Sequence, residues 1–307
     1  PWRISFANDF FSTLNGVTGV MELQPGQVNW GRYNPQPYPG VVRSWLWNAF
    51  AGGLEFICSY RFRQPLYGGE QFHYGMVGTD GVTESSGGKQ YRQFMTELRE
   101  LRKHYKPGAT MPAEYSARTT AVLYNVENLW ETTNQPQTYQ WDQKAFTFKY
   151  YGTLKSLSVP VKFAREEDDL SAFPYVVIPA YQMVSPEIVS KWEEYVHNGG
   201  HLIITLRTAL KNKDGHFFEA PWANAIRQLI GAKIKMNDML DGDKKALVSM
   251  GTKTFSWNNW GDILEPAQGT ETWASYTDQF YAGMSAVTHR KSGKGTVTYI
   301  GTDTDDG

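Results

Sequence analysis

The feature of this 307-residue sequence that most constrains its fold is an alternation of apolar runs with amphipathic segments from about residue 112 onward. Residues 175–179 and 201–206 are apolar apart from their first positions and Thr205, which is typical of strands buried on both faces. Between them, Pro186–His197 has a proline in its first turn and Gly199-Gly200 after its last residue, as helices often do. Shorter strands are expected at 119–124, 159–163 and 296–300, and a helix at 141–157. This order predicts a doubly wound parallel sheet.

The second part of the chain has the pattern of a flavodoxin-like or glutamine-amidotransferase-like sheet. Enzymes of the amidotransferase type carry a cysteine on a tight turn between a strand and a helix. The equivalent turn here follows Leu206 and reads Arg207-Thr208-Ala209-Leu210, with neither a cysteine nor a G-x-S-x-G motif. We therefore do not expect this domain to be an amidase.

The first part of the chain repeats the order strand, loop, helix. We expect a helix at 4–15 that Gly16 ends, a strand at 17–23, a helix at 41–51, a strand at 54–60, a loop at 61–88 and a helix at 89–105. Two such units match part of a β/α barrel, whose chemistry lies at the C-terminal ends of its strands, but they cannot close a barrel. We interpret the chain as an interior piece of a longer protein, with domains at 1–110 and 111–307.

Charged side chains follow both strands of the first domain. Glu22 stands at the end of strand 17–23, where a carboxylate costs desolvation unless it has a role or a partner. It is a candidate nucleophile, or else half of an ion pair. Trp30, in the loop that follows, could stack on a sugar or belong to the core. Glu70 and His73 could hold sugar hydroxyls by charge-assisted hydrogen bonds, or form a local salt bridge.

Two arginines, Arg61 and Arg63, follow the second strand, and one of them could steady the charge of Glu22.

The net charge of −1 argues against nucleic acid or an anionic membrane surface as a partner. The single cysteine, Cys58, excludes an intrachain disulfide and a thiolate metal cluster, and it is predicted to be buried. No apolar run is long enough to span a bilayer, and no signal peptide is visible. Because we interpret the native N-terminus as missing before Pro1, the absence of a signal peptide does not decide the compartment; the cytoplasm is the expectation.

The motifs around these residues resemble glycoside hydrolase family 42 β-galactosidases. The resemblance rests on the run Met21-Glu22-Leu23-Gln24-Pro25-Gly26 with Val28-Asn29-Trp30, on 42–47, on Tyr60-Arg61-Phe62-Arg63-Gln64 and on Glu70-Gln71-Phe72-His73. Residues 112–307 are similar to the trimerisation domain of the same family. The resemblance implies the last strands and helices of a (β/α)8 TIM barrel followed by a flavodoxin-like or amidotransferase-like α/β domain, assembled as a homotrimer.

The same resemblance implies a retaining hydrolase of terminal non-reducing β-D-galactosides, acting through a galactosyl-enzyme intermediate. Glu22 matches the nucleophile, and Trp30, Glu70 and His73 match positions that bind the galactosyl unit. No metal or organic cofactor is implied. The family's acid/base glutamate, the cysteine zinc cluster of some members and the small C-terminal β domain have no counterpart in this chain, so we expect the chain alone to be inactive.

Two other functions remain open. A related retaining glycosidase such as an α-L-arabinopyranosidase would need most of the same hydroxyl contacts. A non-catalytic oligomerisation or sugar-binding module would need no carboxylate at the position of Glu22, which is the feature that discriminates it from an enzyme.

Overall fold

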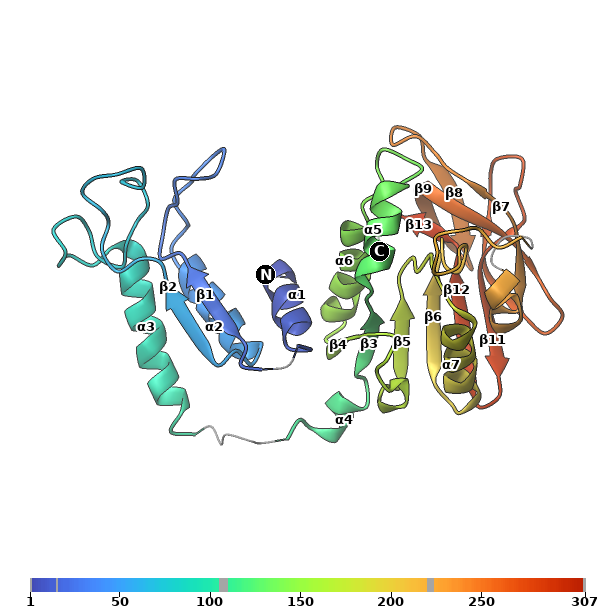
Figure 1. The fold of residues 1–307 in the computed structure, drawn as a ribbon, viewed down its shortest axis with the longest axis horizontal. Helices are drawn as coiled ribbons and strands as arrows, with labels where there is room; N and C mark the ends of the chain where they lie inside the picture. The colour runs from blue at the N-terminus through green and yellow to red at the C-terminus, as the bar shows by residue number, and fades with distance from the viewer. Residues whose placement is uncertain (1, 15, 105–109, 220–223, 306–307) are drawn as a thin grey trace. The chain divides into compact units, whose positions relative to one another are not determined.

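The computed structural model describes residues 2–14, 16–104, 110–219 and 224–305, and it has the α/β fold that the sequence predicts (Figure 1). The chain divides into two compact units, Pro1–Met111 and Pro112–Gly307. No helix in the described ranges is long and apolar enough to cross a membrane.

The first unit is built on two parallel strands and three helices. Its elements, in chain order, are α1 (Trp2–Phe11), β1 (Gly19–Leu23), α2 (Val41–Ala51), β2 (Phe56–Ser59) and α3 (Ser86–Leu101). Gly19 pairs with Phe56 and Leu23 pairs with Ser59, so β1 has one residue more than β2 over the same length. The irregularity lies between Val20 and Leu23, which makes Met21 and Glu22 part of a β-bulge.

The apolar core of the first unit lies where α2 and α3 pack against the sheet. Val42 and Leu46 of α2 meet Phe94 of α3 there, and Ile57 of β2 packs against them. Neighbouring side chains of a strand point to opposite faces, so Cys58 points away from this core. Cys58 is exposed, and the prediction that it is buried is wrong.

Two predicted helix boundaries in the first unit are also wrong. The helix expected at 4–15 ends at Phe11, five residues before Gly16. The helix expected to begin at residue 89 begins at Ser86, because the Ser85 side chain accepts a hydrogen bond from the backbone N–H of Gly88. Its predicted end at residue 105 and the Pro107-Gly108 pair lie outside the described residues.

The two glycines at the start of α3 are packing residues rather than loop residues. A Cβ atom on Gly87 would lie 1.4 Å from the carbonyl oxygen of Pro25, and one on Gly88 would lie 2.0 Å from that of Met76. Only glycine allows such an approach of backbone to backbone. The first turn of α3 therefore fits directly against the loop that follows Glu22.

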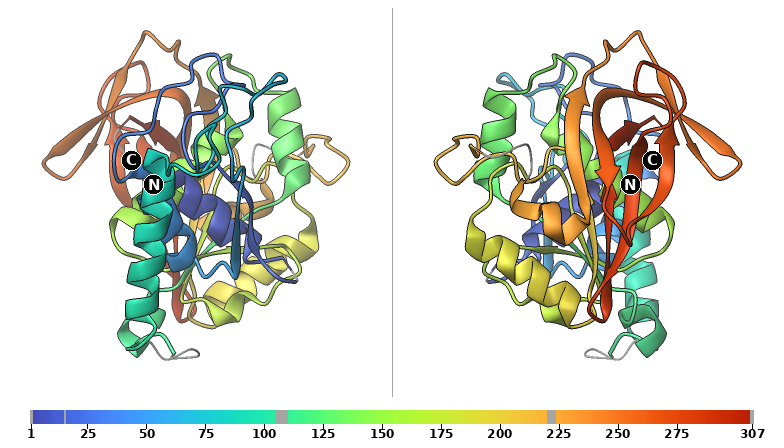
Figure 2. Two further views of the ribbon diagram at one scale, coloured as in Figure 1. Left: turned by 90° about the vertical axis from the view of Figure 1, so that its left-hand side faces the viewer. Right: turned by 90° about the vertical axis from the view of Figure 1, so that its right-hand side faces the viewer.

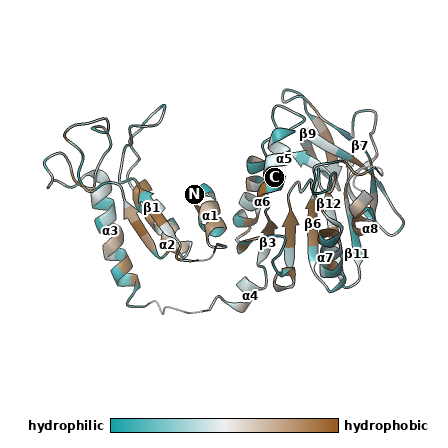
Figure 3. Cartoon of the chain, in the orientation of Figure 1, coloured by the Kyte–Doolittle hydropathy of each residue, from teal (hydrophilic) through white to brown (hydrophobic). Residues whose placement is uncertain are grey.

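The second unit contains the parallel sheet that the sequence predicts. Its strands lie in the order β4-β3-β5-β6-β12, and every neighbouring pair is parallel. Their bounds are β3 (Thr120–Leu123), β4 (Val161–Ala164), β5 (Tyr175–Ile178), β6 (His201–Thr205) and β12 (Gly295–Ile300). β3, β5 and β6 are mostly hydrophobic and appear largely brown in Figure 3. All five strands are confirmed to within two residues at each end.

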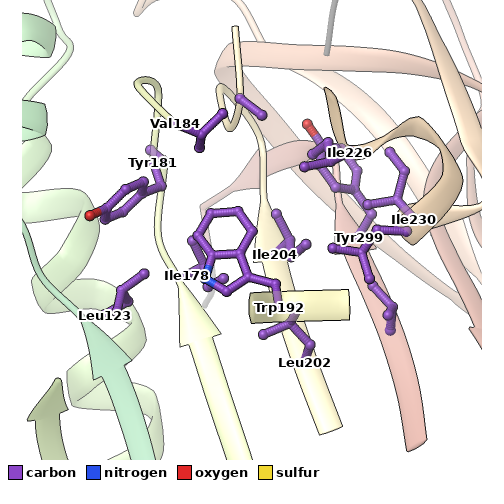
Figure 4. Packing of buried hydrophobic residues seen from close by; sticks show 14 of the residues in the cluster. Leu123, Ile178, Tyr181, Val184, Trp192, Leu202, Ile204, Ile226, Ile230 and Tyr299 are labelled. Atoms are coloured by element: carbon purple, nitrogen blue, oxygen red, sulfur yellow. The ribbon is translucent and has the colours of Figure 1, made fainter. Parts of the chain in front are cut away.

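Helices join several of these strands. α5 (Val126–Asn134) and α6 (Gln143–Ser156) lie between β3 and β4, α7 (Pro186–His197) lies between β5 and β6, and α8 (Arg227–Ile230) follows β6. A short helix, α4 (Ala113–Ser116), precedes β3, and 3-10 turns occur at Leu170–Ala172 and Asn224–Ile226. Trp192 of α7 is fully buried and lies beside Ile178, Leu202 and Ile204 in the main core (Figure 4). The helices predicted at 141–157 and 186–197 are confirmed, the first beginning two residues later.

The sheet is larger than predicted, because antiparallel strands extend it beyond β12. These strands are β7 (Ala232–Asp238), β8 (Ala246–Met250), β9 (Lys253–Pro266), β10 (Glu271–Tyr276), β11 (Ser285–Ser292) and β13 (Thr302–Thr304). They are coloured orange to red in Figure 1 and face the viewer in the right-hand view of Figure 2. The sheet is therefore mixed, with a second small core around Val248, Trp257 and Tyr276.

Candidate active site

Glu22 lies on the bulged end of β1 and is exposed to solvent. Its Oε1 accepts a hydrogen bond from Nε2 of Gln24 at 3.3 Å. A bulge bends its strand and changes the direction of a side chain, and bulges are frequent at barrel rims and beside active sites. The carboxylate is therefore held by a neighbour in its own loop and remains accessible to a ligand.

Hydrogen bonds join the loop after β1 to the loop after β2. The backbone N–H of Tyr60 donates to the carbonyl of Leu23 at 3.2 Å, and that of Tyr74 donates to Gln27 at 2.9 Å. Nδ2 of Asn29 donates to the carbonyl of Gly69 at 2.7 Å. The segment that carries Glu22 therefore lies beside the segment that carries Glu70. Trp30, directly after Asn29, is 70% exposed and is not a core residue.

Glu70 is held by two residues from the end of β2. Its Oε2 accepts a hydrogen bond from the hydroxyl of Tyr60 at 2.7 Å and forms an ion pair with Nη2 of Arg61 at 3.2 Å. The hydrogen bond to the Glu70 carboxylate raises the pKa of Tyr60, since losing the phenol proton would break that bond. The hydrogen bond between Glu70 and His73 joins their backbones: the Glu70 carbonyl accepts from the His73 N–H at 2.9 Å.

His73 is buried, with 1% of its surface exposed. Its Nδ1 lies 3.2 Å from the carbonyl oxygen of Tyr74, and its ring meets the Tyr60 ring edge to face with centroids 5.2 Å apart. Nε2 has no hydrogen-bond partner within the described part of the chain. If Nδ1–H donates to Tyr74, Nε2 is a bare acceptor, which a sugar hydroxyl could reach only after the covering side chains move.

Neither arginine after β2 contacts Glu22. Arg61 faces Glu70 and Tyr60, and Arg63 donates from Nε and Nη2 to the carbonyl of Thr79 at 3.1 and 2.6 Å. The expectation that one of them steadies Glu22 is wrong. The reason is that both guanidinium groups find acceptors in their own long loop.

Tyr60 is the residue of this site that the sequence reasoning missed. It is the first residue after β2, and it contacts both Glu70 and His73. Its position beside Arg61, at the carboxyl end of a strand, is a signal that could have identified it. Next to it, the loop from Arg61 to Glu70 surrounds an open hollow of about 450 Å³.

The tight turn after β6 in the second unit holds a buried arginine. Arg207 has a φ of 61° and is 2% exposed. Its guanidinium lies between the rings of Trp141 and Trp260, at 4.4 and 4.5 Å, and donates to the carbonyls of Gln135 and Pro136 at 3.0 and 2.8 Å. An arginine so enclosed stabilises the turn, and the turn carries no cysteine or serine that could act as a nucleophile.

No group of three or more histidine, cysteine or acidic side chains within the described ranges is arranged to hold a metal ion. The arrangement of the first unit offers an accessible carboxylate at a strand end, an exposed indole, and a second carboxylate fixed at one oxygen. These are groups that can attack an electrophilic carbon, stack on a sugar ring and bind hydroxyl groups.

Comparison with known proteins gives matches along nearly the whole chain. Residues 1–101 match a family model described as β-galactosidase, and residues 118–307 match one described as the β-galactosidase trimerisation domain. Among curated proteins, the chain is 29% identical over 302 residues to β-galactosidase BgaH of Haloferax lucentense, covering 98% of this chain and 43% of that protein. It is 27% identical to β-galactosidase Bga of Halorubrum lacusprofundi, with the same coverage of both chains.

Solved structures agree with these matches. The β-galactosidase structure from Halorubrum lacusprofundi superposes with a TM-score of 0.90 at 27% identity, covering 100% of this chain and 44% of that one. The β-galactosidase structure from Bacillus circulans sp. alkalophilus shares the fold, with a TM-score of 0.89 at 22% identity and coverage of 99% and 46%. The chain thus spans less than half the length of the relatives it matches.

Proposed function

The chain belongs to glycoside hydrolase family 42, and from this membership we propose that it is part of a retaining β-galactosidase. The reaction is the hydrolysis of terminal non-reducing β-D-galactosides through a covalent galactosyl-enzyme intermediate. The observation that carries the proposal is the exposed Glu22 carboxylate on the bulged end of a parallel strand, beside a loop with a second fixed carboxylate. The sugar substrate follows from the names of the relatives.

Glu22 acts as the nucleophile in this proposal. Its carboxylate attacks the anomeric carbon while the glycosidic C–O bond breaks and an acid group protonates the departing oxygen. Water then attacks the anomeric carbon and gives its proton to the same acid group, now acting as a base, while the bond to Glu22 breaks and releases galactose and the free carboxylate. We expect the acid/base group to lie outside residues 1–307, at about 5–5.5 Å from the nucleophile in the complete enzyme.

The remaining site residues bind the galactosyl unit. Glu70 accepts hydrogen bonds from sugar hydroxyls, and the exposed Trp30 ring stacks on the apolar face of the sugar. His73 offers Nε2 as a further acceptor once the side chains that cover it have moved aside. Support comes from the hydrogen bonds that join the loops of Glu22 and Glu70. A sugar bound by Glu70 would then lie on the side of the sheet edge where Glu22 is accessible.

The architecture of the complete protein is part of the proposal. Residues 1–110 form the last strands and helices of a (β/α)8 barrel, because β1 and β2 are parallel neighbours and each is followed by a long loop and a helix. Residues 111–307 form the α/β trimerisation domain of a homotrimer, built as a doubly wound sheet with an antiparallel extension. Sedimentation of the full-length protein should give three chains per particle, and a monomer at micromolar concentration would contradict this.

Replacement of Glu22 in the full-length protein tests the catalytic proposal. Glu22→Gln should lower turnover of a nitrophenyl β-galactoside by several orders of magnitude, and Glu22→Ala should be partly rescued by azide, which can enter the space of the lost carboxylate. Glu55→Gln is the matched control, since Glu55 is an exposed carboxylate next to β2 with no proposed role. Normal turnover by Glu22→Gln would contradict the assignment. A full-length wild type that prefers arabinopyranosides to galactosides would support an arabinopyranosidase instead. An inactive full-length wild type would support a non-catalytic module.

A further inference from the structure

We propose that Tyr60 is a positioning residue for the sugar-binding groups of this chain, with its hydroxyl fixing Glu70 and its ring fixing His73. The inference deepens the proposed function and rests on it. It assigns a role to a residue that has no proposed contact with the sugar and lies one position beyond β2.

The contacts of Glu70 converge on one of its two oxygens. Oε2 takes the hydroxyl of Tyr60 at 2.7 Å and Nη2 of Arg61 at 3.2 Å. Within the described residues no group donates to Oε1, and the Glu70 side chain is 46% exposed. A carboxylate can accept several hydrogen bonds. The free oxygen is therefore available to sugar hydroxyls while the bound oxygen sets its direction.

Tyr60 is suited to this role because its backbone is anchored to the sheet. Its N–H donates to the carbonyl of Leu23 at 3.2 Å, on the strand that carries Glu22. Glu70, by contrast, lies in a long loop directly after Gly68 and Gly69. Because the Tyr60 hydroxyl is fixed to the strands, it holds the Glu70 carboxylate at a set position relative to Glu22. The rate of an enzymatic reaction depends strongly on such relative positions of substrate-binding and reacting groups.

Arg61 strengthens the donor. Its Nη2 lies 2.5 Å from the hydroxyl oxygen of Tyr60, and its guanidinium carbon lies 4.6 Å from the centre of the Tyr60 ring. The cation therefore contacts both the face of the ring and the hydroxyl. With that hydroxyl oxygen accepting from Arg61, the phenolic hydrogen is directed to Glu70.

The ring of Tyr60 has a second contact, with His73. The two rings lie edge to face at an angle of 88°, with centroids 5.2 Å apart. His73 is buried, and its Nε2 is a polar atom without a partner among the residues described. One side chain thus orients both of the groups after β2 that are proposed to bind the sugar.

A double-mutant cycle in the full-length protein tests the inference. Tyr60→Phe keeps the ring and removes the hydroxyl. It should lower kcat/KM for a nitrophenyl β-galactoside about ten- to a hundredfold, which corresponds to the loss of a hydrogen bond to a charged group. Glu70→Gln should lower it at least as much. Because Tyr60 acts through Glu70, the double variant should be no worse than Glu70→Gln alone. Tyr139→Phe, at a fully exposed tyrosine of the second unit, should change nothing.

The outcomes distinguish a failure of the role of Tyr60 from a failure of the proposed β-galactosidase function. An impaired Glu70→Gln with an unchanged Tyr60→Phe would overturn the role of Tyr60 and leave the β-galactosidase proposal standing. Losses that multiply in the double variant would likewise show that Tyr60 acts independently of Glu70. A wild type without galactosidase activity would overturn both. Thermal unfolding of every variant, expected to stay at the wild-type temperature for Tyr60→Phe, distinguishes lost positioning from lost folding.

Discussion

Replacement of Gly87 by alanine should displace the loop that follows Glu22. The added Cβ would lie 1.4 Å from the carbonyl oxygen of Pro25, where ordinary contact requires more than 3 Å. The obstacle is the backbone of a buried Pro25-Gly26 turn, which cannot move aside as the tip of a flexible side chain can. Either the first turn of α3 or this turn must therefore shift.

The expected cost follows from two opposing effects. Overpacking of a well-packed interior costs about 1–3 kcal/mol, and a backbone obstacle puts this case at the upper end. Alanine improves helix propensity over glycine by at most about 1 kcal/mol. The net loss of local stability is thus about 2 kcal/mol, equivalent to roughly thirtyfold faster opening.

Hydrogen exchange of the full-length protein measures this change peptide by peptide. Peptides from 24–31 and from α3 should exchange about thirtyfold faster in Gly87→Ala. Gly152→Ala in α6 is the matched control, because it is the same substitution in a helix with nothing within 4 Å of the new Cβ. It should stabilise its helix by about 0.5–1 kcal/mol. Unchanged exchange around Pro25 in Gly87→Ala would refute the packing argument.

Three further predictions concern stability and activity. Hydrogen bonds from Arg43 and Trp47 lower the pKa of Glu97 to about 2, below its unfolded value of 4.5. The contribution of Glu97 to the free energy of unfolding is therefore complete above pH 4.5 and is lost as the pH falls toward 2. In pH-dependent unfolding, Glu97→Gln should make this loss of stability in acid smaller. Arg207→Met removes the donor to the carbonyls of Gln135 and Pro136 and to Oε1 of the buried Gln182, and should cost about 1–3 kcal/mol in denaturant unfolding. The 307-residue chain alone should not hydrolyse a nitrophenyl galactoside, and measurable turnover would place an acid/base group within it.

The parallel strands could be predicted from the sequence because they are short, apolar and buried on both faces. The antiparallel strands could not, since the buried Trp257, Trp260 and Ile263 stand three residues apart in β9, which is not the two-residue alternation of a half-buried strand. β9 also pairs with β7 and β13 in addition to its neighbour β8. Periodicity says nothing about such pairing. The missed strands account for most of the segment 232–292.

Some features of the candidate site could likewise be predicted from the sequence, and others could not. That the loops of Glu22 and Glu70 lie together could be predicted, because the carboxyl ends of neighbouring parallel strands meet at one edge. The bulge at Glu22 depends on the register between β1 and β2, and the bond from Tyr60 to Glu70 depends on how a long loop folds back. Neither leaves a pattern in the local sequence. The acceptors of Arg61 and Arg63 depend on the same long loop, so the sequence does not show that they are Glu70 and the Thr79 carbonyl rather than Glu22.

The most direct test of the account is to identify the residue that becomes covalently bound to the sugar. A 2-deoxy-2-fluoro galactoside with a good leaving group slows the second step of a retaining enzyme, so the intermediate accumulates. After digestion of the labelled full-length protein, mass spectrometry should find the sugar on the peptide containing Glu22, one label per chain. A label on Glu55, on Glu70 or on a peptide outside this chain would contradict the central claim.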